Sequence, residues 1–160
     1  MNKMNWKTYA FWIILSEAVG GLSGWLSRSG MQYFNTNVAQ PPLSPAPVVF
    51  PIVWGLLFLL MGISAARVSL TPASAQRSRG LNLFVLQLAV NFLWSPIFFN
   101  LRAYVFALLW LILLWILVLT MILSFRKRDS LAAKLQIPYL LWLTFAAYLN
   151  FGVWYLNSGM

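Results

Sequence analysis

Residues 103–125 of the chain read AYVFALLWLILLWILVLTMILSF, and no charged side chain interrupts them. A helix needs about 20 predominantly apolar residues to cross the hydrocarbon core of a bilayer. This stretch is long enough, and it lacks the alternation of polar and apolar residues that marks the strands of a membrane barrel. It therefore predicts a helix that spans a membrane.

Further apolar runs lie on both sides of this stretch. Residues 80–101 and 135–160 carry no charge, and Glu17 alone interrupts residues 8–27. Lys3 and Lys7 ahead of an apolar run also fit a cleaved signal peptide, but the run continues through Trp25 and Leu26 and is long enough to span. We therefore expect the first helix to be retained.

The charge-free run at residues 29–66 is not expected to form two helices. Its first half contains Pro41, Pro42, Pro45 and Pro47, and proline cannot continue a helix because it lacks an amide donor. That half is long for a connector, which favours a stiff, lid-like loop with a function. We expect a single domain over residues 1–160, an all-α integral membrane protein built as a bundle of five transmembrane helices. The helices are expected at about residues 7–27, 47–68, 79–100, 103–125 and 130–156, and the lid loop at about 28–46.

The amino-acid composition also indicates a membrane protein and excludes other classes of protein. Of 160 residues, 61% are apolar and 8% are charged, whereas soluble domains carry about 25% charged residues. With no Cys or His, the chain has no thiolate, disulfide or imidazole metal site and no triad that needs His. The two acidic residues, Glu17 and Asp129, are expected to lie too far apart for a paired-carboxylate hydrolase. We expect no metal site and name no catalytic residue.

The net charge of +9 reflects membrane topology and not nucleic-acid binding. Lys and Arg occupy short gaps between apolar runs, where they set orientation, instead of one face of a polar domain. All of them except Arg28 and Arg102 fall in the amino-terminal tail and in the second and fourth loops. We expect lipid but no nucleic acid as a partner, and a multi-pass protein of the cell membrane with its amino terminus in the cytoplasm and its carboxyl terminus outside.

Polar residues in the third predicted helix form one candidate site. Gln87, Asn91 and Ser95 recur every four residues and therefore share one helix face. Polar side chains within a bilayer face the bundle interior or a cavity. Hydrogen bonding between helices and ligand binding both explain this face, and position alone does not choose between them.

Tryptophan supplies a second candidate. Most of the nine Trp residues fit the interfacial belt of a membrane protein, but Trp54, Trp94 and Trp142 do not fit it easily. Trp142 is followed one turn later by Ala146, and a small residue beside a large ring leaves room for a flat ligand. Indole faces and one amide suit a large, flat, mostly apolar ligand.

Glu17 is the third candidate, because an acidic residue within a membrane span is a functional candidate by default. No basic residue in a neighbouring span is an obvious partner, so a ligand role and a local hydrogen bond both stay open. Ser16, Gly20 and Gly24 lie on the same helix at four-residue spacing, a pattern typical of close helix packing.

Several motifs together resemble the signature of the tryptophan-rich sensory protein / translocator protein (TspO/MBR) family over about residues 8–156. They are PPLSP at 41–45, FPIVW at 50–54, MGISA at 61–65, NFLWSPIFF at 91–99 and IPYLLWLTFA at 137–146. The resemblance implies a five-helix bundle, commonly a homodimer, whose first loop caps a pocket. It implies binding of porphyrins such as protoporphyrin IX or haem without a covalent bond, and in some members of sterols and synthetic drugs. The implied pocket residues are Trp54, Asn91, Trp142 and Ala146, with Trp94 and Tyr139 as neighbours.

Three functions follow from the resemblance. The first is a membrane receptor or sensory protein that binds porphyrin-type tetrapyrroles and regulates or traffics them. The second is an enzyme that degrades porphyrin with light and oxygen, and the third is a passive conduit for porphyrins. Active transport is disfavoured because no repeated half and no chain of ionisable residues is present.

Two departures from the family pattern matter. Many relatives have Pro-Pro-Gly-Trp where this chain has Pro45-Ala46-Pro47-Val48, so the lid tryptophan is missing, which weakens the case for degradation. No Lys or Arg follows Tyr155, so the weak sterol-recognition pattern is absent and a sterol ligand is less expected.

Overall fold

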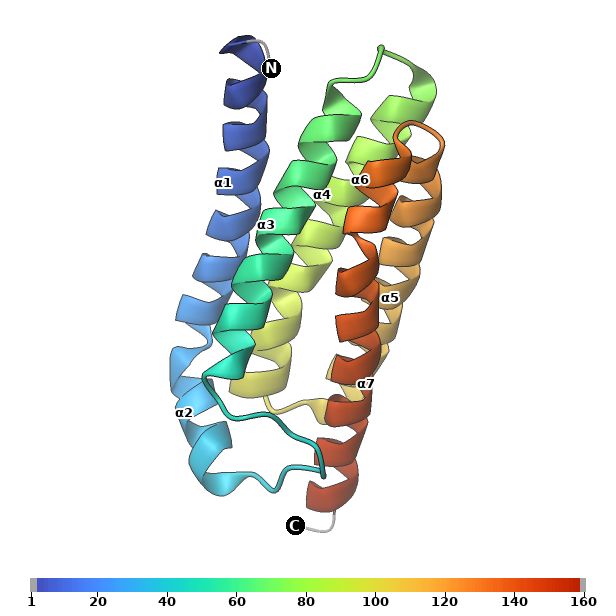
Figure 1. Ribbon diagram of the computed structural model, residues 1–160. Coiled ribbons are helices and arrows are strands. Elements are labelled where there is room, and N and C mark those ends of the chain that lie inside the picture. The colour runs from blue at the N-terminus through green and yellow to red at the C-terminus, as the bar shows by residue number, and fades with distance from the viewer. Residues whose placement is uncertain (1–2, 159–160) are drawn as a thin grey trace.

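The fold is a bundle of helices, seen in a computed structural model that describes residues 3–158 (Figure 1). Five spans within it are long and apolar enough to cross a membrane, as the sequence predicts. Their ranges are Asn5–Leu26, Val49–Ser69, Ala75–Asn100, Tyr104–Arg126 and Ser130–Asn157. The elements are α1 (Lys3–Leu26), α2 (Arg28–Asn37), α3 (Val49–Ser69), α4 (Ala75–Ser95), the π-helix η1 (Pro96–Asn100), α5 (Tyr104–Arg126), α6 (Ser130–Leu135) and α7 (Ile137–Asn157).

Residues 28–37, expected to be part of a loop, form helix α2 instead. Gly30 and Phe34 are buried in this helix, and Phe34 packs on Phe98 and Phe99 with ring centroids 5.4 and 5.2 Å apart. A side chain at Gly30 would overlap the Phe99 backbone, so glycine permits the close approach. Tertiary packing thus stabilises a short, polar helix that isolated propensity would leave unfolded. Between α2 and α3, residues 38–48 are irregular and are here called the lid segment.

The third predicted helix also differs at both ends. It begins at Ala75, four residues earlier than expected, because the Ser74 hydroxyl accepts a hydrogen bond from the Arg77 amide at 3.0 Å and caps it. Its last turn is the π-helix η1, which begins at Pro96. Proline cannot donate to the Phe92 carbonyl four residues earlier. The Ser23 hydroxyl of α1 donates to that carbonyl at 2.7 Å and so links two helices.

The last predicted helix is broken into α6 and α7 at Gln136. Pro138 lies in the first turn of α7, where a missing amide donor is tolerated. The two pieces together still form one span. Pro138 therefore marks a break in the helix and not its boundary at the membrane.

Close packing of α1 on α3 depends on glycine. A side chain at Gly62 would overlap the backbone of Ile13, and one at Gly20 would overlap the ring of Phe58. Without a side chain at these positions the two helix backbones approach closely, as small residues allow in membrane bundles. Figure 1 shows α1 beside α3 towards its carboxyl end and diverging from it towards its amino end.

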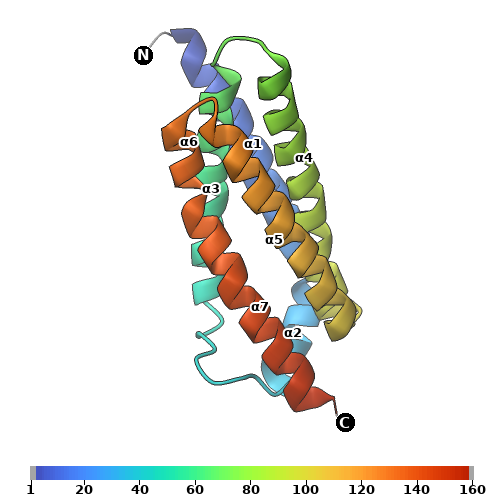
Figure 2. The same cartoon turned by 90° about the vertical axis from the view of Figure 1, so that its right-hand side faces the viewer.

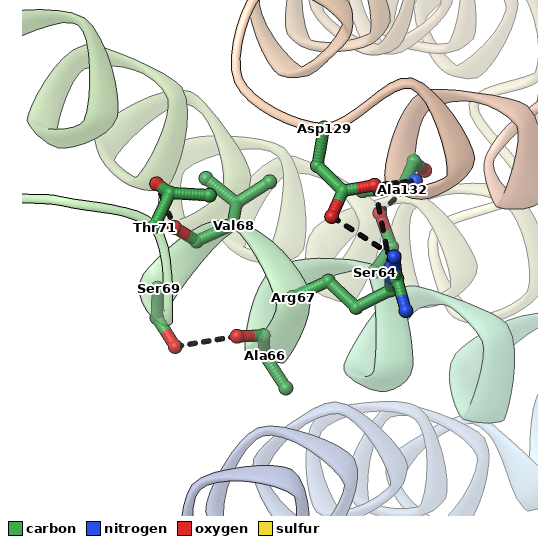
Figure 3. Close-up of polar contacts among 8 residues, drawn as sticks. All are labelled: Ser64, Ala66, Arg67, Val68, Ser69, Thr71, Asp129 and Ala132. Atoms are coloured by element: carbon green, nitrogen blue, oxygen red, sulfur yellow. Dashed lines mark hydrogen bonds and ion pairs between the residues drawn. The ribbon is translucent and has the colours of Figure 1, made fainter. Parts of the chain in front are cut away.

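At the end of the bundle that carries α6, polar contacts join α6 to α3 (Figure 3). Asp129 accepts a hydrogen bond from the Ala132 amide at 3.0 Å, which caps α6, and pairs with Arg67 of α3 at 3.1 Å. The Ser64 hydroxyl donates to the Ala132 carbonyl at 2.7 Å. Burial alone would raise the pKa of Asp129, but the Ala132 amide and the Arg67 guanidinium outweigh it and hold that pKa below its usual value. These contacts fix α6 on α3.

The opposite end carries α2 and the lid segment. In both views these lie near the carboxyl end of α7, far from α6 (Figures 1 and 2). The lid segment runs from α2 across to α7 and returns to the start of α3 (Figure 1). We call this the lid end and the other the α6 end.

Candidate ligand-binding site

A cavity of about 590 Å³ opens inside the lid end of the bundle. Its wall combines residues of α1, α2, the lid segment, α3, α4, η1 and α7. Ligand pockets in proteins commonly measure about 300–1,000 Å³. The space is therefore of the size that holds a bulky small molecule.

The wall of the cavity contains a cluster of aromatic rings. Trp54 and Trp142 contribute perpendicular rings whose centroids are 6.4 Å apart, and Phe50 meets the edge of Trp142 at 5.9 Å. Trp94 stacks on Phe98 at 4.9 Å. The aromatic residues of the wall are Phe34, Phe50, Trp54, Phe58, Trp94, Phe98, Phe99 and Trp142. Such a wall offers both ring faces and ring edges to a flat ligand.

All the binding residues that the sequence suggests, except Tyr139, line this cavity. Trp54 comes from α3, Asn91 and Trp94 from α4, and Trp142 and Ala146 from α7. Tyr139 does not line the cavity: it is 1% exposed and lies in the core behind it. The structure therefore brings residues from three helices to one place, while their role in binding stays a prediction.

Tyr139 connects two polar residues of α4. Its hydroxyl donates to the Gln87 side-chain oxygen at 2.7 Å and accepts from the Asn91 amide nitrogen at 2.6 Å. The expected hydrogen bonding between helices is present, because Gln87 is buried and bonded to Tyr139 of α7. Asn91 also lines the cavity, and its role in ligand binding stays a prediction. This network fixes the Asn91 side chain and leaves its oxygen without a hydrogen bond within residues 3–158.

The lid segment is attached to α7. The Tyr148 hydroxyl donates to the Pro42 carbonyl at 2.7 Å, and Asn157 exchanges two hydrogen bonds with the backbone of Ala39. The ring of Pro41 occupies the space that a side chain at Gly152 would need. Of the lid prolines, Pro47 alone lines the cavity, whereas Pro41, Pro42 and Pro45 do not.

Two groups of wall residues were missed by sequence reasoning. Met31 and Phe34 reach the cavity from α2, whose existence was not expected. The spacing of Met31, Phe34 and Val38, at positions i, i+3 and i+7, is the helical signal that was present. Phe98 and Phe99 reach it from the π turn, and a π turn often marks a functional site.

Glu17, whose role the sequence left open, lies in the cavity wall. The Trp142 indole nitrogen and the Ser95 hydroxyl belong to wall residues as well, and neither atom has a hydrogen-bond partner within residues 3–158. Buried polar groups are normally paired. Together with neutral polar residues such as Asn91 and Asn150, these groups add polar chemistry to a mostly apolar wall.

Comparison with known proteins identifies the family to which the chain belongs. Residues 12–156 match the TspO/MBR family. The chain is 39% identical to protein CrtK of Rhodobacter capsulatus, over 89% of this chain and 88% of that one. It is 34% identical to the tryptophan-rich protein TspO of Chlorobaculum tepidum, over 94% and 96%, and 32% identical to the human translocator protein, over 86% and 82%. This chain is a multi-pass membrane protein that belongs to the TspO/MBR family.

Proposed function

We propose that this protein binds porphyrin-type tetrapyrroles in the cavity at the lid end, without a covalent bond, and regulates or traffics them. The observation that carries the proposal is a space of about 590 Å³ inside the membrane-spanning bundle, walled by aromatic rings. Apolar burial and ring stacking supply affinity for a large, flat ligand. Names of relatives such as tryptophan-rich sensory protein and translocator protein fit a binding role.

The perpendicular rings of Trp54 and Trp142 suggest how such a ligand is held. A flat macrocycle that stacks on one indole face meets the edge of the other, and both arrangements are favourable for aromatic pairs. Ala146, one turn after Trp142, leaves the face of that indole uncovered by a larger side chain. No Lys or Arg lines the cavity, so the carboxylates of a porphyrin belong at its opening and not in its depth.

Asn91 supplies orientation in this proposal. Its amide nitrogen is engaged by Tyr139, which leaves the side-chain oxygen as an acceptor for a donor on the ligand. A fixed acceptor within an apolar wall discriminates between ligands, because an unmatched polar group costs more than a matched one contributes. Asn91 thus gives specificity while the rings give affinity.

Photochemical degradation of the bound porphyrin is the second candidate. It is favoured by the succession of oxidisable rings from Trp142 to Trp54 to Tyr139, whose neighbouring centroids are 6.4 and 6.3 Å apart. Val48 stands where many relatives carry a lid tryptophan, which weighs against it. Steady illumination in air separates the two functions: catalysis gives a new pigment spectrum faster than free porphyrin bleaches, and equal rates reject it.

We also propose that the protein resides in the cell membrane as a homodimer, with its amino terminus in the cytoplasm and the lid outside. The distribution of basic residues supports this orientation, since Arg126, Lys127, Arg128 and Lys134 flank the α5–α6 turn, while Arg28 and Arg102 are the bases at the lid end. Protease accessibility of a tag at each terminus in sealed vesicles tests it.

Titration with protoporphyrin IX tests the binding proposal. Detergent-solubilised protein is titrated while tryptophan fluorescence is followed, beside the double variant Asn91→Ala/Trp142→Ala. We expect saturable quenching in the wild type and its loss in the variant, because the stacking face and the acceptor are both removed. Equal and non-saturating quenching in both proteins would mean that porphyrin only partitions into the micelle.

A further inference from the structure

One face of α1 contributes a carboxylate and open space to the cavity. Glu17, Gly20, Gly21 and Gly24 follow the spacing i, i+3, i+4 and i+7, so they share one helix face, and all of them line the cavity. At Gly21 and Gly24 no atom lies within 4 Å of the position that a side chain would take. The surface next to the carboxylate is therefore free of protein atoms.

The Glu17 carboxylate has no protein partner in the described part of the chain. No ion pair or hydrogen bond within residues 3–158 includes its side chain; the ion pair found there joins Arg67 and Asp129 at the other end. The cavity wall contains no Lys or Arg, and its other polar residues are neutral. The cavity consequently carries one negative group and no positive group to balance it.

An unpaired carboxylate beside aromatic rings favours a cation as its partner. A carboxylate within a membrane span is costly unless a partner neutralises it. Aromatic rings attract cations through their faces, and this attraction grows when the cation is removed from water. Trp54 and Phe58, which lie 5.6 Å apart in the wall, provide such rings in the same cavity as Glu17.

We propose that the cavity also binds lipophilic organic cations, flat aromatic amines or ammonium compounds, with Glu17 as the counter-ion. The charged nitrogen lies beside the Glu17 carboxylate over the open surface of Gly21 and Gly24, and the apolar part of the ligand fills the aromatic space. This ligand class is distinct from porphyrins, whose carboxylates Glu17 repels. The proposal uses the same cavity but does not require that porphyrin binds there.

Glu17→Gln tests the proposal, because it removes the charge and keeps the shape. The probes are N-methylacridinium, a flat permanent cation, and acridine in its uncharged form, a neutral ring of nearly the same shape. Each is titrated into protein in a non-ionic detergent, and its fluorescence is followed. We expect Glu17→Gln to bind N-methylacridinium about tenfold more weakly than the wild type and to bind acridine equally well.

Asp129→Asn is the matched control, since it removes the same charge at the α6 end of the bundle, and we expect it to bind both probes as the wild type does. Equal affinity of the wild type and Glu17→Gln for N-methylacridinium overturns the proposal. An equal loss for acridine also overturns it, because the effect is then one of shape and not of charge.

Protoporphyrin IX in the same proteins separates this proposal from the proposed function. We expect Glu17→Gln to bind porphyrin at least as tightly as the wild type, because a repulsive charge is gone. If the wild type binds N-methylacridinium through Glu17 but does not bind porphyrin, the cation site stands and the porphyrin proposal fails. The reverse pattern rejects the cation site and leaves the porphyrin proposal in place.

Discussion

The two ends of this bundle are built from similar apolar helices and differ in what fills the space between them. At the α6 end, Val68, Phe125 and Ala132 are completely buried, and the Arg67–Asp129 pair closes the contact between α3 and α6. At the lid end, helices enclose a cavity of about 590 Å³. Close packing stabilises one end, whereas the other keeps an unfilled cavity.

Backbone geometry follows the same division. The residues other than glycine with a positive φ, within the described chain, are Leu43 at 71° and Arg102 at 52°, and both lie at the lid end. The π turn at Pro96 lies there too. Such conformations cost free energy and persist only where surrounding contacts maintain them. The strained residues and the aromatic-lined cavity therefore lie at the same end of the bundle.

The largest expected effect is a loss of stability from the α6 end. Phe125→Ala removes a fully buried ring that packs on Phe84 and Gly80, and we expect it to lower the free energy of unfolding by about 3–5 kcal/mol. Unfolding in mixed micelles measures this change. The folded fraction should still bind porphyrin with wild-type affinity, and a matching loss of affinity would contradict the separation of the two ends.

The next effect concerns affinity and the lid end. Trp142→Ala removes a ring of the cavity wall, and we expect porphyrin to bind about thirtyfold more weakly, which corresponds to about 2 kcal/mol. Trp115→Ala is the matched control, because Trp115 donates to Thr144 at 2.9 Å and does not line the cavity. A comparable loss in both variants would place the ligand elsewhere.

Tyr139→Phe removes the hydroxyl that connects Gln87 in the core with Asn91 in the cavity wall. It leaves the buried Gln87 oxygen unpaired and frees Asn91 to rotate, so we expect a loss of about 1–2 kcal/mol in stability and roughly fivefold weaker porphyrin binding. A double-mutant cycle with Asn91→Ala measures the coupling. Additive effects on affinity would show that Tyr139 does not position Asn91.

Asp129 makes the stability of the α6 end depend on pH. Its lowered pKa means that the folded state favours the carboxylate, so the stabilisation is present above the ordinary Asp pKa, about 3.9, and disappears as the pH falls through the lowered value. Asn is as good a helix cap as Asp, so Asp129→Asn keeps the bond to the Ala132 amide and loses the ion pair with Arg67. We expect it to cost up to about 1 kcal/mol at neutral pH and nothing in acid. Unfolding curves of both proteins over this pH range measure the difference, and a constant difference would reject the assignment.

The smallest effect is kinetic. Asn157→Ala removes the two hydrogen bonds that attach Ala39 of the lid segment to α7, and we expect porphyrin to dissociate a few-fold faster, with stability changed by less than about 1 kcal/mol. Stopped-flow displacement gives the rate. Ser158→Ala, which removes a hydroxyl that donates to the Tyr155 carbonyl at the end of α7, is the control.

Sequence reasoning succeeded where hydropathy carries the information. The five spans follow from long charge-free runs, because crossing a bilayer requires apolar length whatever the neighbours are. It failed at residues 28–37, because the contact of Phe34 with Phe98 and Phe99 is not visible in local composition. The π turn at Pro96 and the break at Pro138 were signalled by proline, but their form depends on which neighbour satisfies the freed carbonyls.

The candidate site shows the same limit. Asn91 and Trp142 stand out in the sequence because they are polar or large within a span, and both line the cavity. The family resemblance named Tyr139 as a neighbour of these residues, yet it lies behind the wall, because a matching motif does not give the depth of a residue in the fold. That Glu17 lies in the same wall depends on how α1 packs against α3, which a single sequence does not reveal.

Filling the cavity tests the central claim most directly. Ala146→Phe places a ring in the space beside Trp142 without altering a polar group or the α6 end. Protoporphyrin IX affinity and the free energy of unfolding are measured on the same preparation. The account predicts that saturable porphyrin binding is lost while stability is unchanged within about 1 kcal/mol. Unchanged porphyrin affinity in a folded Ala146→Phe protein would contradict it, because the ligand would then bind outside the cavity.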